Sequence, residues 1–191
     1  MANLEVFEEF MVGYQNMVYS TAFRILGNEA DAMDVAQEVF LRAYQHFEKL
    51  HDNPRAGGWL RRVARNLSLN QITRYRNRWK MFSELESDDS DEDFVSRVAA
   101  ESDDTSQLDE SRRQQILEEA LSKLPDKQRI PLTLYHFEDM SYEEIAKQLG
   151  VSLGKVKTDI HRAREALKKT IRFDDEGDIV RSYFDSMKNQ P

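Results

Sequence analysis

The sequence predicts an all-α protein made of two small helical domains joined by a flexible acidic linker. Seven Gly and four Pro among 191 residues, without runs of apolar/polar alternation, argue against a β architecture with many turns. Hydrophobic residues make up 40% and charged residues 32%, which favours modest cores with a large wetted surface. The net charge of −8 is unevenly distributed, because residues 54–80 carry eight basic and no acidic residues, whereas residues 81–111 carry twelve acidic residues and one basic residue.

Three helices are expected in a first domain over residues 1–80. Apolar residues three or four positions apart predict a first helix that ends at Gly27. A second helix places Ala36, Phe40, Ala43, Phe47 and Leu50 on one face. Residues 51–54 and the pair Gly57 and Gly58 then separate it from a third, basic helix over residues 59–78.

The stretch that follows the basic helix is strongly acidic and poor in apolar residues. Its burial cannot offset the entropy of ordering the chain, so residues 81–108 are predicted to be a disordered linker. The final residues, 172–191, are expected to be a tail with a frayed end, and the alternative is an amphipathic turn that binds a partner.

Four helices are expected in a second domain over residues 109–171. A fourth helix stops at Pro125, and a fifth over residues 126–137 contains Pro131, where we expect a local kink. Ser141 begins a sixth helix with the spacing of a capping box, and a turn at Gly150 leads to a seventh helix that extends to about residue 169.

The last two of these helices have the pattern of a helix-turn-helix. The second of the pair is rich in side chains suited to a major groove. The candidate DNA-binding residues are Ser152, Lys155, Lys157, Thr158, His161, Arg162 and Arg164. An ordinary αα-hairpin within a bundle is the alternative that spacing alone leaves open.

The basic helix is a second candidate nucleic-acid surface. A run of one sign of charge indicates a polyanionic partner, since solvated helix faces usually mix signs. Arginines neutralise phosphates, aromatic rings stack on exposed bases and amides read base edges. The candidates are Trp59, Arg61, Arg62, Arg65, Asn66, Asn70 and Arg74. The alternative is that Trp59, Val63, Leu67 and Ile72 form a core face, and both interpretations are compatible.

Several other classes of protein are disfavoured. The chain has no Cys, its four His lack metal-ligand spacing, and no phosphate loop, nucleophile elbow or paired catalytic carboxylates occur. We therefore expect no enzyme activity, no cofactor and no metal. Without a targeting segment or an apolar run long enough to span a bilayer, the chain is expected to be soluble and cytoplasmic, with no membrane insertion.

Several motifs, in this order, resemble the extracytoplasmic-function (ECF) group of RNA polymerase sigma factors in the sigma-70 family. Residues 34–43 resemble the polymerase-binding helix of that family and residues 59–66 its promoter-melting helix. Residues 124–125, 142–146 and 161–165 resemble its second DNA-binding domain. The resemblance covers nearly all of the chain except the linker and the last 20 or so residues.

The resemblance implies sigma region 2 over residues 1–80 and sigma region 4 over residues 109–171. Asp34, Gln37, Glu38 and Arg42 would bind core RNA polymerase, and the implied partners are the beta-prime clamp, the beta flap, promoter DNA and an anti-sigma factor. The basic helix would recognise and open the minus-10 element, and the helix-turn-helix would recognise the minus-35 element. Asp159, Asn70, Thr73 and Pro131 depart from the pattern of the family.

Two other functions are compatible with the residues alone. One is a stand-alone helix-turn-helix regulator that binds operator DNA without polymerase. The other is an interaction protein that binds polymerase or another factor and never touches DNA. The polar face with Gln37 and Glu38 favours a sigma factor over the stand-alone regulator, because a protein that only binds operator DNA does not need this face.

Overall fold

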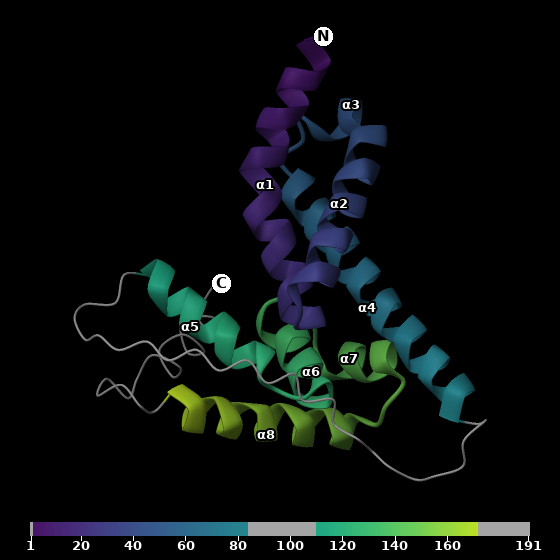
Figure 1. Ribbon diagram of the computed structural model, residues 1–191, viewed down its shortest axis with the longest axis vertical. Helices are drawn as coiled ribbons and strands as arrows, with labels where there is room; N and C mark the ends of the chain where they lie inside the picture. The colour runs from purple at the N-terminus through teal and green to yellow at the C-terminus, as the bar shows by residue number, and fades with distance from the viewer. Residues whose placement is uncertain (1, 84–109, 172–191) are drawn as a thin grey trace. The chain divides into compact units, whose positions relative to one another are not determined.

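The structure, a computed structural model, describes residues 2–83 and 110–171 (Figure 1). Within these ranges every regular element is an α-helix, and the chain divides into two compact units. The predicted all-α class with two helical regions is confirmed. Most of the predicted linker and the whole predicted tail lie outside the described residues, and the domain boundaries at residues 80 and 109 stay predictions.

The first unit contains α1 (Ala2–Leu26), α2 (Glu29–Gln45), α3 (Phe47–Leu50) and α4 (Ala56–Ser83). The helix α1 packs against both α2 and α4, and α2 also contacts α4. The core between them contains Val18, Ala22, Val39, Leu60 and Ala64, all fully buried. The first helix ends as predicted, because Gly27 follows it with a φ of 75°.

The predicted second helix is two helices in the structure. The helix α2 ends at Gln45, His46 leaves the helical conformation with φ −115° and ψ 15°, and α3 begins at Phe47. The break directs Phe47 into an aromatic cluster, with its ring centroid 5.1 Å from that of Phe7 and 5.5 Å from that of Phe10. Aromatic packing therefore interrupts the helix where periodicity predicted continuity.

The predicted break at Gly57 and Gly58 is wrong, because both residues lie in the first turn of α4. A Cβ atom at Gly57 would come within 3.1 Å of the Tyr14 ring on α1. The glycine at this position therefore permits a close approach of α1 and α4. The basic helix also extends further than expected, from Ala56 to Ser83.

The second unit contains α5 (Glu110–Ser122), α6 (Asp126–His136), α7 (Tyr142–Leu149) and α8 (Leu153–Ile171). The long helix α8 packs against each of the other three. Its buried apolar side chains, Val156, Ile160, Ala163 and Leu167, recur three or four residues apart and form one stripe. The helix α6 continues through Pro131, and the kink expected there stays a prediction.

The two ends of α7 are capped as predicted. Ser141 Oγ accepts a hydrogen bond from the backbone amide of Glu144 at 3.2 Å, and the Glu144 carboxylate accepts one from the amide of Ser141 at 2.8 Å. At the other end of α7, Gly150 adopts a left-handed φ of 65°. This capping box and glycine cap set the start and the end of the helix.

Replacing Ser141 with alanine should lower the free energy of unfolding by about 1 kcal/mol, because the Glu144 amide at the start of α7 loses its side-chain acceptor. Chemical denaturation of the full chain, followed by circular dichroism, measures this loss. Lys147→Ala, an exposed substitution on the same helix, is the matched control. Equal stability of the two variants would contradict a stabilising role for the capping box.

Candidate nucleic-acid and partner interfaces

The helix α4 interleaves buried apolar side chains with exposed polar ones. Leu60 and Ala64 are fully buried. Trp59 is half-buried, with its ring edge-on to His46 at 6.0 Å between centroids. Arg65 is half-buried, whereas the other predicted minus-10 residues are exposed, namely Arg61, Arg62, Asn66, Asn70 and Arg74. We call these five residues the α4 basic face.

The core-face interpretation of α4 is also correct for part of the helix. Trp59, Val63, Leu67 and Ile72 pack against the core of the first unit. The helix thus uses its apolar residues for folding and leaves the cations and amides of the α4 basic face exposed to solvent.

A hydrogen bond between residues far apart in the sequence connects α4 to the beginning of α2. Gln71 Nε2 donates a hydrogen bond to Asp31 Oδ1 at 2.6 Å, and Asn28 Nδ2 donates to Asp31 Oδ2 at 2.7 Å. The Asp31 amide donates to Asn28 Oδ1 at 2.9 Å, which caps α2. Nothing in the local sequence pattern indicated that Gln71 has a partner 40 residues away.

The four predicted polymerase-binding residues come together on one side of α2. Asp34, Gln37 and Arg42 are exposed and Glu38 is half-exposed, while Val35, Val39 and Ala43 are buried on the opposite side. Arg42 Nε donates to Glu38 Oε1 at 2.8 Å. We call these four residues the α2 polar face. Because Glu38 and Arg42 oppose each other, Asp34 carries the uncompensated charge.

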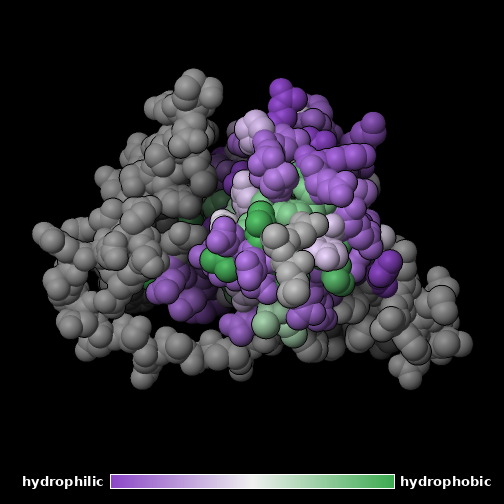
Figure 2. Space-filling view, turned by 90° about the horizontal axis from the view of Figure 1, so that it is seen from above, coloured by the Kyte–Doolittle hydropathy of each residue, from purple (hydrophilic) through white to green (hydrophobic). Residues whose placement is uncertain are grey.

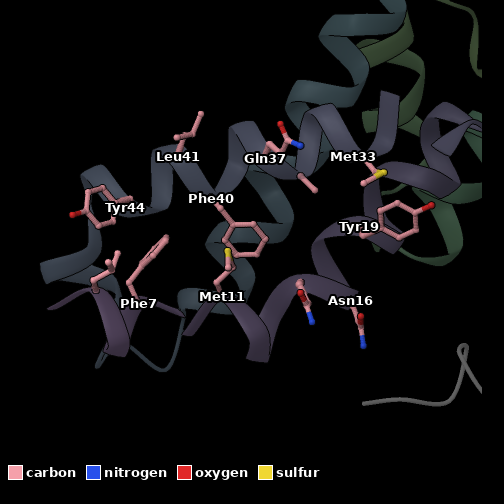
Figure 3. Close-up of a pocket in the computed structure, with 12 residues that line it drawn as sticks. Phe7, Met11, Asn16, Tyr19, Met33, Gln37, Phe40, Leu41 and Tyr44 are labelled. Carbon is pink, nitrogen blue, oxygen red and sulfur yellow. The ribbon is translucent and has the colours of Figure 1, made fainter. Parts of the chain in front are cut away.

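Beside this face lies an apolar groove that the sequence reasoning missed. It has a volume of about 730 Å³ and is lined by Leu4, Phe7, Met11, Gln15, Asn16 and Tyr19 of α1 and by Met33, Ala36, Gln37, Phe40, Leu41 and Tyr44 of α2 (Figure 3). The sequence signal that could have indicated the groove is the set of apolar residues of α2, such as Met33 and Leu41, that lie between its polar residues. Gln37 belongs to both the groove and the polar face.

Several groove residues are unusually exposed for their type. Met33, Leu41 and Tyr44 are 56%, 62% and 52% exposed. The space-filling view likewise shows a few hydrophobic residues exposed among hydrophilic ones (Figure 2). A shallow apolar groove with carboxylates at its edge suits a protein partner that combines apolar and basic side chains.

The helix α8 presents a continuous basic face to solvent. Lys157, Thr158, His161 and Arg162 are all exposed, and at 100° per residue they occupy an arc of about 140°. Ser152, a candidate DNA-binding residue, lies at the start of this helix, and its Oγ accepts a hydrogen bond from the Lys155 amide at 3.2 Å. We call the four exposed residues the α8 basic face.

Arg164 lies at the junction of α8 with α6 and α7. Its Nε donates to His136 Nε2 at 3.2 Å, and its guanidinium lies 5.5 Å from the centre of the Tyr135 ring. Tyr135 stacks on Tyr142 at 4.6 Å, and burial, more than the neighbouring Tyr135, raises the pKa of the Tyr142 hydroxyl. Arg164 therefore has an internal packing role that sequence reasoning did not indicate.

Lys155 is paired in the structure. Its Nζ lies 2.9 Å from Asp159 Oδ1 and 2.8 Å from Asp159 Oδ2, one turn further along α8. The Asp159 side chain is only 8% exposed, whereas that of Lys155 is 49% exposed. Their spacing of four residues on a helix is compatible with an ion pair, but the burial of Asp159 depends on tertiary packing.

Among the described side chains, no group of three or more His, Asp or Glu residues is arranged to hold a metal ion. No helix in residues 2–83 or 110–171 is long and apolar enough to cross a bilayer.

Both units match families of known proteins. Residues 10–78 match sigma-70 region 2 and residues 114–167 match sigma-70 region 4. The ECF RNA polymerase sigma factor SigW of Bacillus subtilis is 31% identical over 172 residues, which cover 88% of this chain and 90% of SigW. The ECF sigma factor SigE of Mycolicibacterium smegmatis is 36% identical over 87% of this chain and 62% of SigE.

A solved structure of the sigma factor RpoE with the anti-sigma factor NepR, from Bartonella quintana, is also similar. It is 23% identical, covers 88% of this chain and 98% of that chain, and has a TM-score of 0.48.

Two helical units, one of them a helix-turn-helix and both with exposed cations, define a DNA-binding transcription factor. The chain belongs to the ECF group of the sigma-70 family of RNA polymerase sigma factors, which confirms the predicted family. It is accordingly a non-enzymatic transcription initiation factor that acts in promoter recognition.

Proposed function

We propose that the first unit binds core RNA polymerase through α2 and opens the minus-10 element with α4, while the second unit places α8 in the minus-35 element. The observation that carries this proposal is the separation of charge between helices. The α2 polar face has two carboxylates beside an apolar groove, whereas α4 has no acidic residue at all. Surfaces of opposite sign on one domain suit two different partners.

The α2 polar face, together with the groove, is the proposed site for the beta-prime clamp. Asp34 supplies an exposed negative charge, and the groove supplies apolar area for a helix of the partner. An anti-sigma factor that blocks polymerase binding would be expected to cover the same surface. The second unit is the proposed partner of the beta flap.

The α4 basic face is the proposed minus-10 surface. Opening DNA requires a preference for separated strands, and cations alone give no such preference because duplex DNA has the denser charge. Bases that leave the stack expose edges that an amide can bind. Asn66 is exposed one turn after Arg62, and Asn70 is exposed one turn before Arg74, so amides and cations are neighbours on one helix. We assign base capture to the amides and phosphate contacts to the arginines, including Arg65 and Arg74, with Trp59 supporting the helix.

The α8 basic face is the proposed minus-35 surface. Lys157, His161 and Arg162 point away from the buried stripe, and Thr158 lies among them. The Thr158 hydroxyl donates to Gly154 O at 2.9 Å, which leaves its oxygen free to accept a hydrogen bond. A recognition helix that enters the major groove uses such a face.

Charge reversal at Asp34 tests the polymerase surface. Asp34→Arg should weaken binding to core enzyme by about tenfold, or about 1.4 kcal/mol, because an attractive contact becomes repulsive. Glu38→Lys should act in the same direction and also removes the Arg42 ion pair. Competition with labelled parent protein for core enzyme measures the change.

The control for charge reversal is Glu48→Lys, which makes the same change in charge as Glu38→Lys on an exposed residue of α3. It should compete as well as the parent. If Asp34→Arg and Glu38→Lys also compete normally, the α2 polar face does not bind polymerase. A protein that shifts promoter DNA equally well without core enzyme would instead favour the stand-alone regulator.

Salt dependence tests the minus-35 surface. Lys157→Ala and Arg162→Ala should each reduce the magnitude of the slope of log K against log salt by about 0.9, since each removes one phosphate contact. Filter binding of holoenzyme to a minus-35 duplex at several salt concentrations gives the slope. Unchanged slopes for both variants would place α8 away from the DNA.

The melting role of α4 is tested with the double variant Asn66→Ala and Asn70→Ala. Holoenzyme with this variant should bind promoter duplex normally but open it poorly, because each captured base that stacks or pairs with protein contributes roughly 1–3 kcal/mol. Permanganate footprinting of unpaired thymines reports opening, and a premelted bubble template should restore activity. Equal defects in duplex binding and on the bubble would show that the amides are structural.

A further inference from the structure

The ion pair between Lys155 and Asp159 runs against the ordinary preferences of a helix. Lys155 is the third residue of α8, where the helix dipole disfavours a cation, and the first turn contains no acidic residue. A lysine four residues before an acid is also the weaker order for a pair on a helix. Asp159 is 5% exposed, so its carboxylate loses most of its hydration. Helix formation alone therefore gives no account of the pair.

The pair changes what Lys155 is able to offer to DNA. The ammonium has three N–H groups, and the two carboxylate oxygens lie within hydrogen-bond distance of it. The charges of the two groups cancel, so Lys155 adds little to the long-range attraction of phosphates. About half of its side chain remains exposed, with a donor left over. The result is a fixed, nearly neutral hydrogen-bond donor.

The position of Lys155 suits the reading of a base. The first residues of a recognition helix are the ones that reach base edges, whereas cations further along contact the backbone. Lys155 lies in the first turn of α8 at one edge of the α8 basic face, while Lys157 and Arg162 are exposed along that face. Lysine donors prefer the O6 and N7 acceptors of guanine in the major groove.

We propose that Lys155 and Asp159 form one base-reading unit, in which Asp159 is a positioning residue that holds the Lys155 ammonium toward a guanine of the minus-35 element. The inference rests on the proposed placement of α8 in that element. It assigns Asp159, which the resemblance marks as a departure from the family pattern, to promoter selectivity.

The test compares holoenzymes on a minus-35 duplex and on every single-base-pair change of it, with the salt slope measured for each. Asp159→Asn keeps the shape of the side chain and releases the ammonium. This variant should increase the magnitude of the salt slope by about 0.9 and reduce the preference at one G·C pair roughly tenfold. Lys155→Gln should reduce the same preference, and Lys155→Arg should retain it.

Lys157→Ala is the matched control, with a slope smaller by about 0.9 and the preference of the parent at every position. Circular dichroism melting confirms folding, and Lys155→Gln tests the proposal even if Asp159→Asn unfolds, because the glutamine amide can still donate a hydrogen bond to the Asp159 carboxylate. The base preferences of the parent in both Lys155→Gln and folded Asp159→Asn would overturn the inference while leaving the proposed function intact. Unchanged slopes for Lys157→Ala and Arg162→Ala would overturn both.

Discussion

The packing of α1 against both α2 and α4 is the constraint on which the first unit depends. Val18 and Ala22 of α1 are fully buried between the two helices, and Gly57 allows the Tyr14 ring to approach the start of α4. Because α1 holds α2 and α4 by their apolar sides, their polar sides are left exposed. The hydrogen bonds of Asp31 with Asn28 and Gln71 add a second, polar link between α2 and α4.

This arrangement explains how the chain tolerates a helix with so many cations. Residues 54–80 contain eight basic residues and no acidic one, so neighbouring charges on α4 repel each other. Leu60, Ala64 and Leu69 are buried, and their burial opposes that repulsion. Removing one leucine side chain from water stabilises the folded state by about 1.5–3 kcal/mol. The apolar core therefore stabilises a helix whose exposed positive charge favours binding of a polyanion.

Much of the fold could be predicted from the sequence, because helix periodicity and caps are local signals. The end of α1 at Gly27, the capping box at Ser141 and the left-handed Gly150 were all readable. The break at His46 and the helical Gly57 were not, since aromatic packing between α1 and α3 and a close contact of α1 with α4 decide them. The candidate site divides in the same way: exposed cations follow from helix spacing, whereas the groove and the partners of Gln71 and Arg164 depend on tertiary contacts.

The two candidate DNA-binding helices differ in how they treat their charged groups. On α4 the arginines and amides of the basic face are exposed and no carboxylate is near in the sequence, which suits strands that change shape as they separate. On α8 Lys155 is held by Asp159 and Arg164 by His136, so donors at the edges of the basic face are fixed by the domain. Fixed donors suit a duplex, whose base edges are presented at constant spacing, and they lose less conformational entropy when DNA binds. The chemistry of each helix therefore agrees with the form of DNA proposed for it.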